Sequence, residues 1–259
     1  MWIALFVVLL FVASWFVPGP QIARAIAGFV PVAALMFAVE FNADANRKLS
    51  NHECWRIRRA RLSGVLAWRK IWMVLLNLFI ASSAFLTLLQ TRHPNSTGSS
   101  LLRLAAGVAL LYASAALIFE LSALGFQMAG YSLPLMHRSP IAARSVSEFW
   151  GQRWNRIVSA WLRAFIFRPV ARRRHAGVAV VCSFLVSGVF HGWPMLVALG
   201  TAAALSTVVF FTIQAVFVLV ENRLRIHTWP HALARAWTLA VLLVSSPLLI
   251  DPGLRLFGF

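Results

Sequence analysis

The chain has 259 residues, of which 60% are hydrophobic and only 12% are charged. Its mean hydropathy is +0.77, whereas a soluble domain contains about 45–50% apolar residues, so this composition excludes an ordinary soluble domain. The formal net charge of +17 would suggest nucleic-acid binding in a soluble protein. Here the basic residues gather between apolar runs, which indicates membrane topology instead. We expect no nucleic-acid partner.

Seven long apolar runs predict a polytopic, all-α transmembrane protein. Most of them approach the roughly 20 residues that a helix needs to cross about 30 Å of hydrocarbon. They cover residues 2–17, 22–41, 65–89, 104–126, 177–199, 203–220 and 236–250. Neither a long polar linker nor an internal repeat divides them, so we expect about seven spans in a single membrane domain, 1–259.

Basic residues are concentrated in alternate connections, 47–70, 138–174 and 223–235, while the other connections hold only Arg24, Arg92, Arg103 and Arg255. This asymmetry predicts that the basic connections and the amino terminus are cytoplasmic and that the carboxyl terminus is outside. The expected location is a bacterial inner membrane or a membrane of the endoplasmic-reticulum type. We expect the first run to be a retained helix and not a signal peptide, because no basic region precedes it and no small-x-small cleavage site lies near Pro18.

Residues 127–175 are too polar for one lipid-facing span and too rich in Trp and Phe for an ordinary loop. Ser145-x-x-Glu148 has the form of a capping box and predicts that a helix begins there. An apolar stripe then recurs at three- and four-residue steps, which predicts one amphipathic helix that Pro169 ends. The stripe consists of Trp150, Trp154, Ile157, Trp161 and Phe165. We expect this helix at the membrane interface, with the indoles at headgroup depth; a simple anchor is the competing interpretation.

His191 lies inside the next apolar run. An ionisable side chain at membrane depth is expensive and is a functional hypothesis by default. A neutral imidazole can act as a general base. Ser187, one turn earlier, is within reach to orient the ring, and Gly188 and Gly192 leave space for a substrate or a close helix. A hydrogen-bonded packing histidine is the alternative. For Asn155 taken alone, a structural cap or network role is favoured over catalysis.

These motifs together resemble the wax synthase-like branch of the membrane-bound O-acyltransferases (MBOAT). The resemblance rests on Ser145-x-x-Glu148-Phe149-Trp150-x-x-Arg153-Trp154-Asn155, on Trp161-Leu162-Arg163 and Arg168-Pro169, and on Phe184-Leu185-Val186-Ser187-Gly188-x-x-His191. It covers roughly residues 120–221, which would form the acyltransferase core. It implies transfer of a fatty acyl group from acyl-coenzyme A, a co-substrate and not a cofactor, to the hydroxyl of a lipophilic alcohol, giving a wax ester.

The resemblance also implies that His191 is the catalytic base and Asn155 its companion. We expect further substrate contacts from Trp150, Arg153, Trp154, Arg156, Arg163, Ser187 and Glu120. Arginines can bind the phosphates of coenzyme A, although cytoplasmic retention explains each one singly. Glu120 could line the acceptor path, but an ion pair or a protonated structural role is an equal alternative.

We expect no metal, because Pro230 separates His227 from His231 and no carboxylate accompanies them. Two other functions remain open from the sequence. One is a non-catalytic lipid-binding or transport protein that keeps the fold. The other is the same fold acylating a sterol, a short alcohol or a natural-product hydroxyl.

Overall fold

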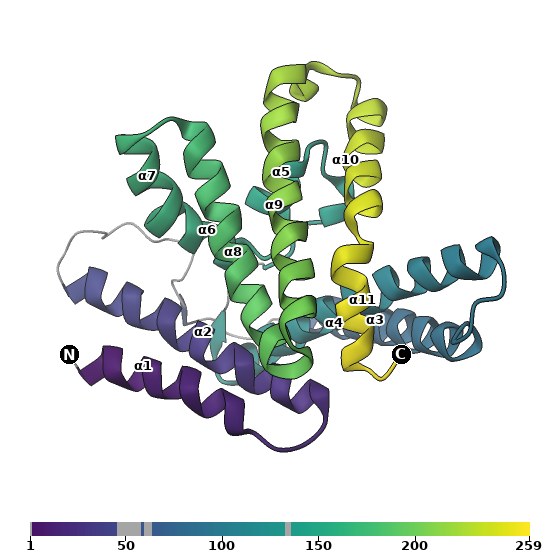
Figure 1. Ribbon diagram of the computed structural model, residues 1–259, viewed down its shortest axis with the longest axis horizontal. Helices are drawn as coiled ribbons and strands as arrows, with labels where there is room; N and C mark the ends of the chain where they lie inside the picture. The colour runs from purple at the N-terminus through teal and green to yellow at the C-terminus, as the bar shows by residue number, and fades with distance from the viewer. Residues whose placement is uncertain (1, 46–57, 60–63, 133–135) are drawn as a thin grey trace.

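The computed structural model describes residues 2–45, 58–59, 64–132 and 136–259 (Figure 1). In these residues the ordered elements are helices apart from two short strands, β1 (Arg58–Arg59) and β2 (Tyr131–Ser132), which pair antiparallel. The predicted all-α class is confirmed. Most of the first basic connection, residues 46–57 and 60–63, lies outside the described residues.

The first two helices form a hairpin. Helix α1 (Trp2–Ala13) continues into the 3-10 turn η1 (Ser14–Phe16), and α2 (Gln21–Ala45) follows. Gly19, in the turn between them, has φ +114°, a conformation that suits glycine. The 12-residue helix α1 is only about 18 Å long, short of the roughly 30 Å that a span must cross.

Five helices in the described part of the chain are long and apolar enough to cross a membrane. They are α2, α3 (Gly64–Gln90), α4 (Thr97–Met128), α8 (Ala176–Leu199) and α9 (Thr201–Leu224). Helices α10 (His231–Ser245) and α11 (Pro247–Leu256) make a sixth span if they are counted together, but they are bent by 52°. The proline at position 247 explains the break, because it lacks the N–H that would continue α10. The protein is an integral, multi-pass membrane protein, and the described residues contain five helices that could span a membrane, or six if α10 and α11 are one span, where about seven were expected.

The antiparallel pair α8 and α9 forms the centre of the molecule (Figure 1). Its helices approach closely at two glycines: a Cβ atom on Gly188 would lie 3.3 Å from Val208 Cα, and one on Gly192 would lie 3.3 Å from the Ala204 carbonyl oxygen. The α1–α2 and α3–α4 pairs extend to opposite sides of this centre in Figure 1. Small residues therefore set the helix spacing at the histidine-bearing part of α8.

The Trp-rich region is not the single helix that its periodicity predicts. It consists of α5 (Val146–Glu148), the π-helix η4 (Phe149–Arg153), α6 (Arg156–Leu162), the π-helix η5 (Arg163–Phe167) and α7 (Arg168–Arg173). Asn155 interrupts it with φ +34°. Pro169 does not end the helix; it lies in the first turn of α7, where the wide π-turn before it leaves room for the ring.

The arginine-rich ends of this region and of α9 lie at the same end of the bundle. Arg172, Arg173 and Arg174 come just before α8, and Arg223 and Arg225 come at the end of α9, which runs antiparallel to α8. The structure thus places two of the predicted basic connections together. Their cytoplasmic orientation stays a prediction.

Candidate active site

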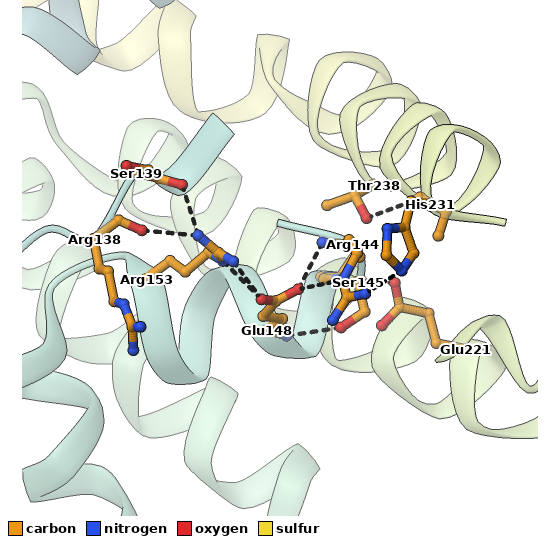
Figure 2. Close-up of polar contacts among 11 residues, drawn as sticks. Arg138, Ser139, Arg144, Ser145, Glu148, Arg153, Glu221, His231 and Thr238 are labelled. Atoms are coloured by element: carbon orange, nitrogen blue, oxygen red, sulfur yellow. Dashed lines mark hydrogen bonds and ion pairs between the residues drawn. The ribbon is translucent and has the colours of Figure 1, made fainter. Parts of the chain in front are cut away.

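The site begins at the turn that enters α5. Ser145 is the N-cap, and its Oγ accepts a hydrogen bond of 2.9 Å from the backbone N–H of Glu148. In a capping box the Glu148 carboxylate would accept from the backbone N–H of Ser145. Here it has other partners. It accepts from the backbone N–H of Arg144 at 2.7 Å and pairs with Arg153 at 2.7 Å (Figure 2). The helix start was predicted correctly, and the partner of Glu148 was not.

Arg153 is a structural clamp. Besides its bond to Glu148, its guanidinium donates to the carbonyl oxygens of Arg138 and Ser139 at 3.1 and 3.2 Å (Figure 2). Burial raises the pKa of the Glu148 carboxyl, but the Arg144 N–H and the Arg153 charge outweigh it and hold this pKa below its usual range. The two side chains together fix the loop that leads into the Trp-rich region.

Asn155 caps the helix after the break. Its Oδ1 accepts a hydrogen bond of 3.3 Å from the backbone N–H of Val158, in the first turn of α6. Asn155 also has a left-handed backbone, with φ +34°, a conformation that asparagine tolerates better than most residues. Since the cap occupies Oδ1, the donor group Nδ2 is the end of the amide that remains for a ligand.

His191 is held by the backbone of its own helix. Its Nδ1 lies 2.8 Å from the carbonyl oxygen of Ser187. A carbonyl oxygen only accepts, so Nδ1 carries the hydrogen and Nε2 carries the lone pair. The ring lies between Phe211, at 4.7 Å between centroids, and Phe29, at 6.3 Å. The prediction that Ser187 orients the imidazole is correct, but the backbone oxygen makes the contact.

A cavity of about 580 Å³ lies between the Trp-rich region, α8 and α9. Its lining includes Arg163 and Arg168 as well as aromatic side chains, among them Trp150, Phe184 and Phe211. Arg163 makes a long hydrogen bond of 3.4 Å to the carbonyl oxygen of Gly151, which leaves most of its donors available. The cavity therefore offers cationic groups for an anion and an apolar wall for a hydrocarbon chain.

Six of the nine predicted site residues line this cavity: Trp150, Trp154, Asn155, Arg163, Ser187 and His191. The other three, Arg153, Arg156 and Glu120, are not in its wall, and their contact with a substrate stays a prediction. Arg153 is bound in the clamp described above. Arg156 opens α6, where its backbone N–H donates to Met136 at 3.0 Å. Glu120 is half-buried on α4, and its charge interacts with that of Lys70.

The tryptophans of the predicted interfacial stripe pack inside the protein. Trp161 is only 3% exposed, and its Nε1 donates to the carbonyl oxygen of Met36 on α2 at 3.2 Å. The Trp154 ring lies 4.4 Å from that of His137. These indoles join the Trp-rich region to other elements, and their depth in the membrane stays a prediction.

Glu221, near the end of α9, is a functional-region residue that the sequence analysis did not single out. Arg223 and Arg225 follow it closely, which is typical of a solvated helix end, yet Glu221 is only 3% exposed. Its carboxylate accepts from the backbone N–H groups of Val146 and Ser147, at 2.6 and 3.2 Å, and from Trp237 Nε1 at 3.1 Å. The sequence does contain a signal for this burial. Glu221 lies seven residues after Gln214, and this spacing puts both side chains on one helix face.

His231, the second histidine of the His227–His231 pair, has an arginine neighbour. Arg144 Nη1 lies 2.7 Å from His231 Nε2 (Figure 2), and a guanidinium only donates, so this histidine nitrogen acts as an acceptor. Among the described residues no three His, Cys, Asp or Glu side chains are grouped so that they could hold a metal ion.

Residues 133–213 match the model of the membrane bound O-acyl transferase family. The resemblance to the membrane-bound O-acyltransferases is confirmed. The match ends in α9 and includes the Trp-rich region and His191.

Several plant relatives of this family are similar to the chain. Probable long-chain-alcohol O-fatty-acyltransferases 7 and 3 of Arabidopsis thaliana are 30% and 31% identical to it over 128 and 130 residues. These stretches are 45% and 47% of this chain but 38% and 37% of the relatives. Probable long-chain-alcohol O-fatty-acyltransferase 9 is 40% identical over 70 residues, 24% of this chain and 20% of that protein. The chain therefore spans well under half the length of each of these relatives.

Proposed function

We propose that the protein is a membrane-embedded O-acyltransferase that moves a fatty acyl group from acyl-coenzyme A to the hydroxyl of a lipophilic alcohol. The observation that carries the proposal is the Nδ1 contact of His191 with Ser187, at 2.8 Å, in the wall of a cavity that also contains arginines. The tautomer that this contact selects leaves Nε2 as a base. The names of the plant relatives support a long-chain alcohol as the acceptor.

In the proposed reaction the Nε2 atom of His191 takes the proton of the alcohol hydroxyl as its oxygen attacks the thioester carbonyl carbon. The tetrahedral intermediate collapses, the carbon–sulfur bond breaks, and the thiolate of coenzyme A leaves. The imidazolium returns its proton to the thiolate, so the enzyme ends in its starting state. The transfer is direct, and no covalent acyl-enzyme forms.

Asn155 would stabilise the charge that develops on the thioester oxygen. Its Oδ1 is used as the helix cap, at 3.3 Å from the Val158 nitrogen, so Nδ2 is the group that donates. A donor held in place before the reaction stabilises an oxyanion at little cost in reorganisation. The hydrogen bond with which Asn155 caps α6 therefore also orients the proposed catalytic amide.

Arg163 and Arg168 would bind the phosphates of coenzyme A. Guanidinium groups bind phosphate oxygens strongly, and both of these arginines line the cavity. They lie in the predicted cytoplasmic connection, where acyl-coenzyme A would be available, in a bacterial inner membrane or a membrane of the endoplasmic-reticulum type. The proposed chemistry uses acyl-coenzyme A as a co-substrate and involves no metal or other cofactor.

The test is acyl transfer from labelled palmitoyl-coenzyme A in membranes that carry the wild type, His191→Ala or His191→Gln. Fatty alcohols, sterols and short alcohols serve as acceptors. His93→Ala is the matched control, because His93 is exposed in the connection between α3 and α4. We expect ester from the wild type and the control, with a loss of at least about 100-fold in both His191 variants.

Each other result has a definite meaning. Equal ester formation by correctly inserted His191→Ala protein would overturn the base assignment. Ester formed only with sterols or short alcohols would change the proposed acceptor class but would still support the proposed acyl transfer. Absence of ester from the wild type across all acceptors would overturn the enzymatic proposal in favour of a lipid-binding or transport role.

A further inference from the structure

Two buried polar side chains on one face of α9, Gln214 and Glu221, form hydrogen bonds outside their own helix. Gln214 is 0% exposed and Glu221 is 3% exposed, and the two lie seven residues apart. A buried amide or carboxylate is costly unless it is hydrogen-bonded. Both residues bond to the Trp-rich region: Glu221 to its first backbone N–H groups and Gln214 to the indole of Trp150. The polar face of α9 therefore fixes the position of the Trp-rich region.

The hydrogen bonds of Gln214 have one consistent direction. Its Oε1 accepts from Trp150 Nε1 at 3.2 Å, since an indole nitrogen only donates. Its Nε2 donates to the Oγ of Ser245 at 2.8 Å, and that hydroxyl donates to the carbonyl oxygen of Val241 at 2.7 Å. This chain of bonds joins α10 to the indole through α9. The amide orientation is thus determined at both ends.

Trp150 connects Gln214 to the cavity wall. The indole lines the cavity and packs against Phe211, with 5.5 Å between ring centroids. It also meets Phe210 at 6.0 Å and Phe184 at 6.4 Å, with interplanar angles of 75° and 90°. Phe211 lies 4.7 Å from His191. A change in the orientation of Trp150 would therefore alter the space next to the proposed catalytic base.

Aromatic contacts without the hydrogen bond to Gln214 would restrict the orientation of the Trp150 indole less. Aromatic contacts tolerate rotation and sliding of one ring against another, whereas a hydrogen bond fixes one edge of the ring. A leucine or methionine at position 214 would fill the same volume without an acceptor for Trp150. The glutamine is thus explained by the orientation of the tryptophan and not by the packing of α9.

We propose that Gln214 is a positioning residue that sets substrate chain-length selectivity by fixing Trp150 in the wall of the cavity. Gln214 does not line the cavity, so it acts through the indole. The inference rests on the proposed acyl transfer, because selectivity is measured with acyl-coenzyme A substrates.

The experiment compares kcat/KM for acyl-coenzyme A substrates from octanoyl to stearoyl in the wild type, Gln214→Met, Trp150→Phe and the double variant. Trp150→Phe removes the donor but keeps an aromatic ring. We expect each single variant to change the ratio of kcat/KM for long-chain to kcat/KM for medium-chain acyl-coenzyme A by about fivefold. A change of this size corresponds to the loss of one hydrogen bond. We expect the double variant to match the single ones, because both remove the same interaction.

Two further variants separate positioning from general loss of structure. Gln127→Met is the matched control: Gln127 is a buried glutamine, 7% exposed, on α4 and away from the cavity. It should keep the wild-type ratio. Gln214→Glu retains an oxygen acceptor for Trp150 and, when protonated by burial, a donor to Ser245, so it should restore the wild-type ratio.

Wild-type selectivity in Gln214→Met, or independent effects that multiply in the double variant, would overturn the inference. If Gln214→Met does not fold, Trp150→Phe with an unchanged chain-length ratio would have the same meaning. Absence of transfer by the wild type with every donor would instead overturn the proposed function, so the two failures are distinguishable.

Discussion

The Nδ1 atom of His191 and the carbonyl oxygen of Ser187 lie 2.8 Å apart, one turn from each other on α8. In a regular helix this carbonyl also bonds along the backbone, and an oxygen with two lone pairs can accept both hydrogens. The contact needs no residue from another helix. A span that carries a histidine can therefore select its tautomer by itself, whereas the surrounding cavity depends on the packing of neighbouring elements.

Replacement of Gly28 by alanine should destabilise the contact between α2 and α8. A Cβ atom at this position would lie 2.7 Å from Pro194 Cα, a backbone atom that cannot move without moving the helix. We expect a loss of about 1–3 kcal/mol, seen as a lower temperature of unfolding in detergent. Gly125→Ala is the control, because no atom lies within 4 Å of its Cβ position. Equal stability of the two variants would show that α2 adjusts freely.

Glu221→Gln should weaken the attachment of α5 to α9. The carboxylate accepts three hydrogen bonds, and the amide would turn an NH₂ group toward N–H donors. An unsatisfied buried donor costs about 1–3 kcal/mol, so the unfolding temperature should fall clearly. Asp251→Asn changes the same group where its side chain is 65% exposed, in an ion pair with Arg255. That control should cost less than about 1 kcal/mol, and a similar loss in both would contradict a special role for Glu221.

Arg153→Lys should loosen the loop before α5 even though the charge is kept. The guanidinium bonds to Glu148 through two nitrogens and reaches the carbonyl oxygens of Arg138 and Ser139. A lysine ammonium cannot make all of these contacts from one position. We expect faster proteolysis of this loop and a lower unfolding temperature. Arg255→Lys, in the exposed pair with Asp251, should behave like the wild type; unchanged proteolysis of Arg153→Lys would show that charge alone suffices.

Stability should fall as the pH is lowered from about 6.5 toward 4. Burial lowers the pKa of His137 to about 4, from an unfolded value of about 6.5. Between these values the unfolded chain binds a proton that the folded protein excludes, so the free energy of unfolding decreases as the pH falls. The Nε2 atom of this histidine is buried without a partner among the described residues, beside Trp154 and Phe119.

His137→Phe keeps the aromatic packing and removes the titration. Its unfolding temperature should therefore vary less between pH 7 and pH 4.5 than that of the wild type. His93→Phe, at an exposed position, is the control and should keep the wild-type slope. The same slope in His137→Phe would mean that other groups cause the acid sensitivity. The lowered pKa of Glu148 adds a loss of stability at still lower pH, once that carboxylate is protonated.

Apolar runs and motif spacing predicted the class of the molecule, most of its spans and the histidine. These features depend on neighbours in sequence: a run of apolar residues determines that a helix enters the bilayer, and a four-residue step places Ser187 beside His191. The interpretation failed where one residue interrupts the pattern. The periodicity from Trp150 to Phe165 indicates a continuous helix, but the left-handed backbone of Asn155 and two π-turns divide it.

The sequence by itself determined a helical membrane protein with a Trp-rich acyltransferase-like segment and one candidate base. Only the tertiary structure decided which polar residues meet. Trp150 and Gln214 are 64 residues apart, and Val146 and Glu221 are 75 apart. The same packing turned Arg153 away from the cavity and brought Arg163 to it. Local patterns determine the form of each helix, whereas contacts over such separations depend on the angle and depth at which helices pack, which no single segment encodes.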